Sequence, residues 1–306
     1  MRIGVTLPLA AGDSPDGHVP TFVETLDFAA QAERGGIDSI WVYDHLLFRF
    51  PGQPQEGVQE SWTTLAAIAS RVPRVELGSL VMCTSFRNPG VMAKMAGALD
   101  DLSGGRLILG LGSGWHDPEY EAFGFPIDSR VGRFAEDLEV TARLLRGERV
   151  SLAGRWRTVQ DAELVPPPAR RIPILVAAKG ERMLRLTATW AEAWNTAWFG
   201  RTDDRMLTRL ASLERACHEV GRDPATMRRT VGIRLHDPGT NHEDLLGLDA
   251  DVAGLADLVD ELAGLGIDDA IVWSISKSTA ALDRIAEARH LHLERGQSAS
   301  SATMRG

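Results

Sequence analysis

The chain contains few cysteines, few lysines and no long run of charge of one sign. Only Cys83 and Cys217 are cysteines among its 306 residues, and their spacing matches neither a metal-binding pattern nor a disulfide framework. Of the 33 basic residues, the only lysines are Lys94, Lys179 and Lys277, and the formal net charge is -9. Binding to nucleic acid or to an anionic membrane surface is therefore not expected.

Long apolar runs are also missing. No apolar segment reaches the length that a membrane-spanning helix requires. The chain starts directly with a strand-like segment and shows no signal peptide, so the expected location is the reducing cytoplasm. A disulfide between the two cysteines is possible but is not expected there.

What the chain does contain is a repeated strand and helix pattern. Strand-like apolar runs alternate with amphipathic helical segments, and most runs are apolar almost throughout, as in strands covered on both faces. Eight such units in this length match a single (β/α)8 barrel, an α/β fold of the TIM type. The eight expected strands are residues 3–9, 39–43, 76–82, 107–111, 174–177, 193–197, 230–235 and 270–273.

Three segments interrupt this pattern. Residues 45–60 follow the second strand, residues 150–171 precede the fifth as an expected hairpin and proline segment, and residues 236–249 follow the seventh. The first and third should lie at the carboxyl ends of the strands, where barrels carry their active sites. We expect one barrel domain over residues 1–294 and a serine-rich, disordered tail over residues 295–306.

The second strand ends in an acid and a histidine, Asp44 and His45. At a strand end both side chains can face the barrel mouth, and a neutral imidazole can give or take a proton near pH 7. A structural histidine bonded to a loop carbonyl would show the same pattern, so both interpretations stay open at this point.

The fourth strand runs into a glycine-rich loop, LGLGSGW at residues 109–115. Alternate glycines let a planar or phosphorylated ligand approach the backbone. The loop lacks the Gly-Lys-Ser/Thr ending of a Walker loop and the acidic residue of a dinucleotide fingerprint, so it is a weak signal alone.

The fifth strand is followed by Ala178, Lys179, Gly180 and Glu181, which open a helix. Free backbone amides at a helix start, next to a lysine, suit a phosphate group. Alternatively, Glu181 only complements the helix dipole and Lys179 is simply solvated. We favour the phosphate interpretation.

Other polar and aromatic residues at strand ends are less specific. Arg87, after the third strand, can reach an anionic ligand or pair with a loop carboxylate, and Asn195 ends the sixth strand as a possible contact in the mouth. His116 could join His45 in a metal site, as in a metal hydrolase, but the first strand lacks the histidines such barrels carry, so no metal is expected. The tryptophans at 190, 194 and 198 are expected to be core or rim residues.

Taken together, these motifs resemble the bacterial luciferase-like flavin and deazaflavin oxidoreductases over about residues 1–290. The resemblance is carried by WVYDH at residues 41–45, LGS at 77–79 with RNP at 87–89, GLGSGW at 110–115 followed by Glu119 and Gly124, and GER at 180–182 with WN at 194–195. The branch most similar to this chain depends on coenzyme F-420, an 8-hydroxy-5-deazaflavin.

The resemblance implies that the cofactor ring lies across the barrel mouth. It places a non-prolyl cis peptide at Leu80-Val81 behind the ring, and it assigns acid/base chemistry to His45, with Asp44 tuning or orienting it. The cofactor contacts that we expect are Leu80, Val81, Cys83, Ser113, Gly114, Trp115, Ala178, Lys179, Gly180, Glu181 and Asn195.

The expected function is hydride transfer between coenzyme F-420 and a small organic substrate. Trp115 stands where the sugar-phosphate dehydrogenases of this branch tend to have glutamate, which argues against a sugar phosphate, and Lys179 stands where relatives often have glycine. The loops at 46–60 and 236–249 should cover the substrate as a lid, and Phe48, Phe50 and Trp62 suggest that the substrate is hydrophobic.

Two other functions fit the same resemblance. An FMN-dependent monooxygenase would use reduced flavin and oxygen, and a non-catalytic barrel would hold a flavin without turnover. The family resemblance also implies a homodimer and a separate reductase system that supplies reduced cofactor.

Overall fold

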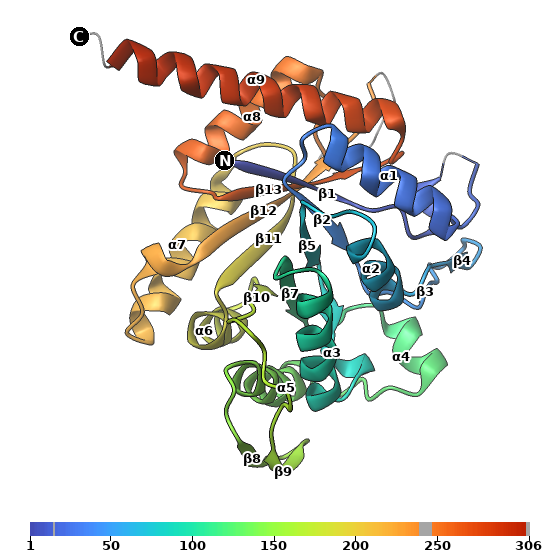
Figure 1. The fold of residues 1–306 in the computed structure, drawn as a ribbon, viewed down its shortest axis with the longest axis vertical. Helices are drawn as coiled ribbons and strands as arrows, with labels where there is room; N and C mark the ends of the chain where they lie inside the picture. The colour runs from blue at the N-terminus through green and yellow to red at the C-terminus, as the bar shows by residue number, and fades with distance from the viewer. Residues whose placement is uncertain (15, 239–246, 304–306) are drawn as a thin grey trace.

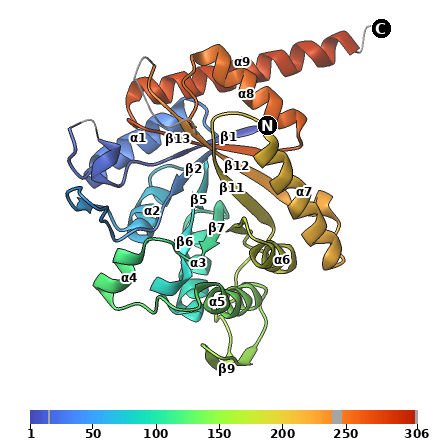
Figure 2. The same cartoon turned by 180° about the vertical axis from the view of Figure 1, so that it is seen from behind.

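The computed structural model describes residues 1–14, 16–238 and 247–303, with side chains up to residue 298. Within these residues, parallel strands close into a barrel surrounded by helices (Figures 1 and 2). The strands follow one another around the barrel in chain order, and the last pairs with the first. They are β1 (Arg2–Thr6), β2 (Ser39–Val42), β5 (Glu76–Ser79), β7 (Leu107–Gly112), β10 (Ile174–Ala177), β11 (Ala193–Phe199), β12 (Arg228–Leu235) and β13 (Asp269–Ser274). The predicted (β/α)8 barrel is confirmed.

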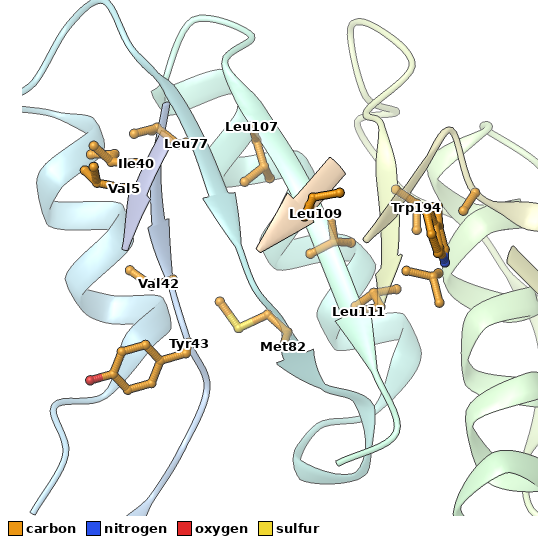
Figure 3. Packing of buried hydrophobic residues seen from close by; sticks show 14 of the residues in the cluster. Val5, Ile40, Val42, Tyr43, Leu77, Met82, Leu107, Leu109, Leu111 and Trp194 are labelled. Atoms are coloured by element: carbon orange, nitrogen blue, oxygen red, sulfur yellow. The ribbon is translucent and has the colours of Figure 1, made fainter. Parts of the chain in front are cut away.

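The helices pack on the outside of this barrel, and their order alternates with the strands as predicted. Apolar side chains on the outward faces of the strands, such as Val5, Ile40, Leu77 and Leu109, are buried in the layer beneath the helices (Figure 3). The helices are α1 (Phe22–Arg34), α2 (Ser61–Ala69), α3 (Pro89–Leu102), α4 (Asp117–Phe123), α5 (Arg130–Leu145), α6 (Glu181–Trp190), α7 (Asp204–Glu219), α8 (Val252–Gly264) and α9 (Thr279–Thr303). None of the helices in the described residues combines the length and apolar character needed to cross a bilayer.

The barrel interior is filled by side chains. Trp41 is fully buried there with Ile108, Leu175, Ala193 and Ile271. Its indole takes the space that side chains at two glycines would need, because a Cβ at position 78 would lie 2.1 Å from Trp41 Cε3 and one at position 4 would lie 2.6 Å from Nε1. Glycine at these positions therefore allows one large aromatic side chain to fill the barrel.

Ion pairs close the barrel at the amino ends of the strands. Arg228 Nε lies 2.6 Å from Oδ2 of Asp269, and Arg228 Nη2 lies 2.8 Å from Oε2 of Glu76. The carboxylate of Asp269 is buried below the apolar filling of the barrel. The functional face is therefore expected at the other end of the barrel, at the carboxyl ends of the strands.

The segments between the main elements match most expectations. The loop after β2 forms a short hairpin from β3 (Leu47–Phe48) and β4 (Glu56–Gly57), and the predicted hairpin before β10 is present as β8 (Val150–Ala153) and β9 (Thr158–Ala162). The third expected strand, residues 76–82, divides into β5 and β6 (Met82–Cys83) around Leu80 and Val81, the place that the resemblance gave to the cis peptide. Of the expected lid at 236–249, residues 239–246 lie outside the described part.

Of the expected tail at residues 295–306, the structure describes residues 295–303. The helix α9 continues to Thr303 and runs past the end of the barrel (Figure 1). Arg295 Nη1 lies 2.6 Å from Asp260 Oδ2 and 2.9 Å from Asp257 Oδ1, both on α8. These ion pairs attach the first turn of the expected tail to α8. The serine-rich composition could not predict them, because they depend on acidic residues of another helix.

Candidate functional site

His45 is the third residue after β2, at the carboxyl end of the barrel, and its side chain is 15% exposed. Its Nδ1 lies 3.0 Å from Oε2 of Glu119, the third residue of α4. Because an ionised carboxylate only accepts hydrogen bonds, Nδ1 carries the proton of this contact. Within the described part of the chain, Nε2 has no hydrogen-bond partner, so this nitrogen can exchange a proton with a ligand.

Glu119 is buried and is held from two sides. Its Oε1 accepts a hydrogen bond from the amide of Leu46 at 2.5 Å and another from the amide of Leu47 at 3.3 Å. Burial alone would raise the pKa of Glu119, but the hydrogen bonds from His45 and the two amides outweigh it and lower the pKa below its ordinary value. The carboxylate therefore stays ionised beside the imidazole.

Asp44 does not orient His45, which corrects the expectation for this pair. Its carboxylate accepts hydrogen bonds from the Ser61 hydroxyl at 2.9 Å, from the Cys83 amide at 2.9 Å and from both terminal nitrogens of Arg87. Consecutive side chains at the end of an extended strand point to opposite sides, which separates Asp44 from His45. Asp44 instead ties the end of β2 to α2 and β6, and Arg87 takes the second of its two predicted roles.

The peptide between Leu80 and Val81 is cis, as the resemblance implied. Both side chains are partly buried and pack on the apolar filling of the barrel, at the end that faces the mouth. A second non-prolyl cis peptide, Ala197-Trp198 in β11, was not predicted.

The glycines of β7 and its loop serve the protein's own packing. A Cβ at Gly110 would lie 1.7 Å from the Ser79 carbonyl oxygen, and one at Gly112 would lie 2.4 Å from Val81 Cγ2. At Gly114, where φ is +75°, a Cβ would lie 1.9 Å from the Tyr120 hydroxyl. The alternate glycines that suggested close approach of a ligand thus make room for neighbouring protein atoms, chiefly for the segment that contains the cis peptide.

Other expected contacts around this loop have defined partners. Ser113 and Gly114 are partly exposed, and the Ser113 carbonyl accepts a hydrogen bond from Tyr120 at 2.8 Å. The Cys83 thiol is buried 3.3 Å from the Tyr120 hydroxyl, and burial raises its pKa to about 11, so it stays protonated. Both Cys83 and Cys217 are free thiols, and no disulfide joins them.

Aromatic rings surround His45. The ring centroids of Phe48 and Trp115 lie 4.4 and 5.4 Å from the imidazole, and the indole of Trp115 is 59% exposed. Further rings continue this group. Tyr43 stacks on Trp273 with 6.1 Å between the ring centroids, and Trp273 and Trp198 form a T-shaped pair with 5.1 Å between their centroids. Trp62, by contrast, lies in the hydrophobic core and not among these rings.

His116 is a structural neighbour of this group. Its Nε2 accepts a hydrogen bond from the Arg49 amide at 3.0 Å, and burial lowers its pKa. The ring is therefore neutral and engaged with the chain. In the described residues, no group of three histidine, cysteine or acidic side chains is placed to hold a metal ion.

The segment at residues 178–181 lies where the sequence placed it, between β10 and α6. Gly180 caps α6 without a side-chain hydrogen bond, and a Cβ there would meet no atom within 4 Å. Lys179 and Glu181 are exposed, and the Ala178 carbonyl accepts a hydrogen bond from Trp194 Nε1 at 2.9 Å. Among the described residues, no side chain caps the amides at this helix start, which leaves room for a ligand there.

Asn195 is buried, as are Cys83 and Ala178 among the expected contacts. Its Nδ2 donates to Oγ1 of Thr230 at 2.8 Å, between β11 and β12. Trp194 is buried in the core, while Trp190 and Trp198 are partly exposed, as expected for core and rim residues.

The functional residue that local sequence reasoning missed is Glu119. It appeared only within the pattern that carried the family resemblance, without a role. An acid three residues after His116, at the start of a short helix that follows the glycine loop, was the available signal. Its partner could not be read from the sequence, because the two residues are 74 positions apart.

Comparison with known proteins adds a family to this geometry. Residues 1–241 match the family model described as luciferase-like monooxygenase. The chain is 31% identical over 214 residues to the "F420-dependent glucose-6-phosphate dehydrogenase" of Kineococcus radiotolerans, covering 68% of this chain and 62% of that protein. It is 36% identical over 213 residues to the phthiodiolone/phenolphthiodiolone dimycocerosates ketoreductase of Mycobacterium kansasii, covering 63% and 57%.

The matched segments thus span about three fifths of the length of these curated relatives. Among solved structures, an "F420-dependent secondary alcohol dehydrogenase in complex with an F420-acetone adduct" superposes with a TM-score of 0.79 at 18% identity, covering 94% of this chain and 97% of that one. At this identity the likeness shows the shared fold alone.

Proposed function

The chain belongs to the luciferase-like monooxygenase family, and from this membership we propose that it is an oxidoreductase that transfers a hydride between coenzyme F-420 and a small organic substrate. Two kinds of relative support the choice of cofactor and reaction, one named as an F420-dependent dehydrogenase and one named as a ketoreductase. The observation in this chain that carries the proposal is the pair of His45 and Glu119 at the barrel mouth.

The residues of this chain fit an anionic flavin-like cofactor. The helix start at Gly180 has open space and uncovered amides, and Lys179 beside it forms no ion pair within the described residues. We assign the phosphate to this place, and the ring to the mouth, with Leu80 and Val81 behind it. Ser113, Gly114 and Trp115 would line the ring or its side chain. When bound, the cofactor supplies a hydride from carbon.

His45 provides the proton that accompanies the hydride. Reduction of a carbonyl needs one hydride at carbon and one proton at oxygen, and His45 Nε2 gives this proton; in alcohol oxidation Nε2 takes it. Glu119 keeps the other nitrogen protonated and stabilises the imidazolium by its charge, as carboxylates do beside catalytic histidines elsewhere. Glu119 is therefore a positioning residue.

We propose a hydrophobic carbonyl or alcohol as the substrate. The rings of Phe48, Trp115, Trp198 and Trp273 give the mouth apolar walls, and apolar surface favours apolar ligands. A sugar phosphate fits less well, because an indole stands at position 115 where the resemblance places a carboxylate in sugar-phosphate dehydrogenases.

Fluorescence titration of the purified protein with coenzyme F-420 and, separately, with FMN tests the cofactor. We expect tight binding of F-420 and weak binding of FMN. Turnover is then followed by the absorbance of F-420 with a panel of apolar ketones and alcohols. His45→Asn should lower kcat by about 10²–10⁴-fold while leaving the F-420 Kd within about twofold.

The second candidate is an FMN-dependent monooxygenase, which the description of the matched family favours. Tight binding of FMN alone, with oxygen consumption in the presence of a flavin reductase, would replace the F-420 proposal with this one. Cofactor binding with no turnover, and no effect of His45→Asn on any cellular phenotype, would favour a non-catalytic flavin-binding barrel.

The family resemblance leads us to propose two further features, a homodimer and a separate reductase system that keeps the cofactor reduced. Sedimentation equilibrium of the full chain tests the first, and a mass of one chain, 33.3 kDa, would contradict it.

A further inference from the structure

Three cations gather beside the start of α6. Lys179 follows β10, and Arg205 and Arg209 stand one turn apart near the start of α7. The strands β10 and β11 are neighbours, joined next to Lys179 by the hydrogen bond from the Ala178 amide to the Asn195 carbonyl at 3.2 Å. The helices α6 and α7 lie side by side outside these strands (Figures 1 and 2).

The two arginines are held in place by the end of β11. Arg209 Nη1 donates to Thr196 Oγ1 at 2.6 Å and to the Ala197 carbonyl at 3.2 Å, and Arg205 Nη2 donates to the Trp198 carbonyl at 3.3 Å. Each hydrogen bond uses one edge of a guanidinium, which leaves other donors of the planar group for a ligand.

Both guanidinium groups also lie over one aromatic ring. Their carbon atoms are 4.2 Å (Arg205) and 5.1 Å (Arg209) from the centroid of the Phe199 ring. Stacking and hydrogen bonding together fix the orientation of the two groups before a ligand arrives, which reduces the entropy lost on binding.

The charges of this cluster are not balanced by the protein. In the described residues, Lys179 and Arg209 form no ion pair, and Arg205 meets only Asp203, at 3.7 Å. Partial loss of hydration and repulsion by the two arginines lower the pKa of Lys179, whose side chain stays partly exposed. Burial and Arg205 lower the pKa of Arg209, which Asp203 partly offsets. Cations without a protein counter-ion, in a chain whose net charge is -9, favour the binding of an anionic ligand.

We propose that Arg205 and Arg209, next to Lys179, bind the anionic tail of the cofactor beyond its first phosphate, and so recognise a tail with several anionic groups. This inference rests on the proposed function and deepens it. A phosphate at Gly180 uses the amides of α6 and Lys179, and the arginines lie on the next helix, where a following carboxylate would arrive. F-420 carries carboxylates after its phosphodiester, whereas FMN ends in a single phosphate.

The test compares Kd values of the full-length protein for F-420 and for the tail-free deazaflavin chromophore, which lacks the phosphate and carboxylates. The variants are Arg205→Gln, Arg209→Gln and the double substitution. Arg215→Gln is the matched control, because Arg215 is also on α7 and its guanidinium donates to the Ser212 hydroxyl at 2.8 Å, with no ion pair in the described part of the chain. Each charge removed should weaken F-420 binding by about tenfold.

Three further results are expected. The double variant should show a flatter dependence of log Kd on log salt concentration. Arg209→Lys should bind F-420 more tightly than Arg209→Gln but more weakly than the wild-type protein, because it keeps the charge and loses the planar group. The tail-free chromophore should bind all variants equally. Thermal unfolding checks that each variant is folded. Unchanged F-420 affinity and salt dependence in the double variant would overturn the subsite while leaving the proposed function intact.

Equal weakening of the tail-free chromophore would also overturn the subsite, because it would show a structural effect on the ring site. Failure of the wild-type protein to bind F-420 at all would instead overturn the proposed cofactor, and this subsite with it.

Discussion

Adjacent residues at the end of β2 have separate tasks. Asp44 is enclosed by Ser61, Arg87 and the Cys83 amide and holds three segments together, while His45 reaches Glu119 and keeps one nitrogen free. The short sequence predicted that a polar pair stands at the mouth, but not that its members separate. The difference depends on which distant side chains meet each residue, and these come from later parts of the chain.

Glu119→Gln should impair catalysis without impairing cofactor binding. A glutamine amide would present a donor to His45 Nδ1, which favours the tautomer with the proton on Nε2 and removes the charge that stabilises imidazolium. We expect kcat to fall by about 10²-fold or more, with the F-420 Kd within about twofold. A variant with normal kcat would contradict the role of Glu119.

The same substitution should have a pH-dependent effect on stability. Because the pKa of Glu119 is lower in the folded protein, its carboxylate adds stability above the ordinary value of 4.5, and this is lost as the pH falls through the lowered pKa. The stability difference between the wild-type protein and Glu119→Gln should therefore be largest near pH 7 and shrink below about pH 4. Urea unfolding at several pH values measures it.

Asp44→Asn should be costly, because it leaves the guanidinium of Arg87 with less charge compensation in a buried place. Breaking a buried pair typically costs about 3–5 kcal/mol. Glu60 contacts the same arginine at 2.8 Å, but its side chain is 45% exposed, so Glu60→Gln should cost less than about 1 kcal/mol. Equal losses in the two variants, measured by urea unfolding, would contradict this ranking.

At the scale of elements, the sequence predicted the strands well because each is an apolar run between amphipathic helices. It could not predict the break between β5 and β6 from apolar pattern, since residues 76–82 read as one strand. It also misassigned the glycines of β7 to ligand approach. A glycine in such a pattern indicates that another group lies close to the backbone. The sequence does not say whether this group is a ligand or a side chain of the same protein, such as Val81 at Gly112.

Gly78→Ala should destabilise the barrel, because its Cβ would overlap the Trp41 indole inside a closed ring of strands. Overpacking of this kind costs about 1–3 kcal/mol, and Trp41→Phe in the same chain should recover part of the loss. Gly264→Ala is the control, since a Cβ there meets no atom within 4 Å, and it should be neutral or slightly stabilising. Thermal unfolding distinguishes the three variants.

At the scale of the whole molecule, a buried ion pair joins the two ends of the barrel sequence. Lys277, after β13, has a fully buried side chain whose Nζ lies 2.9 Å from Asp13 Oδ1 and 3.0 Å from the Leu7 carbonyl, both after β1. Its ammonium also lies over the rings of Tyr43 and Trp273. The sequence showed only a rare lysine in a loop, because the contact spans 270 positions.

Lys277→Met alone should destabilise the protein by about 3–5 kcal/mol, since it leaves the Asp13 carboxylate buried without a cation. The double variant Asp13→Asn, Lys277→Met should recover much of this loss, because no buried charge is left unpaired. Strictly additive losses, measured by urea unfolding, would show that the two groups do not act as a pair.

The filled barrel also determines the order in which reactants can come and go. Within the described residues, Trp41 and the ion pairs of Arg228 fill the axis below the mouth, so cofactor and substrate would both enter through the mouth. In the proposed arrangement, a cofactor ring on Leu80 and Val81 would form the floor on which the second reactant rests. Steady-state kinetics should then be sequential and ordered, with the cofactor first to arrive and last to depart.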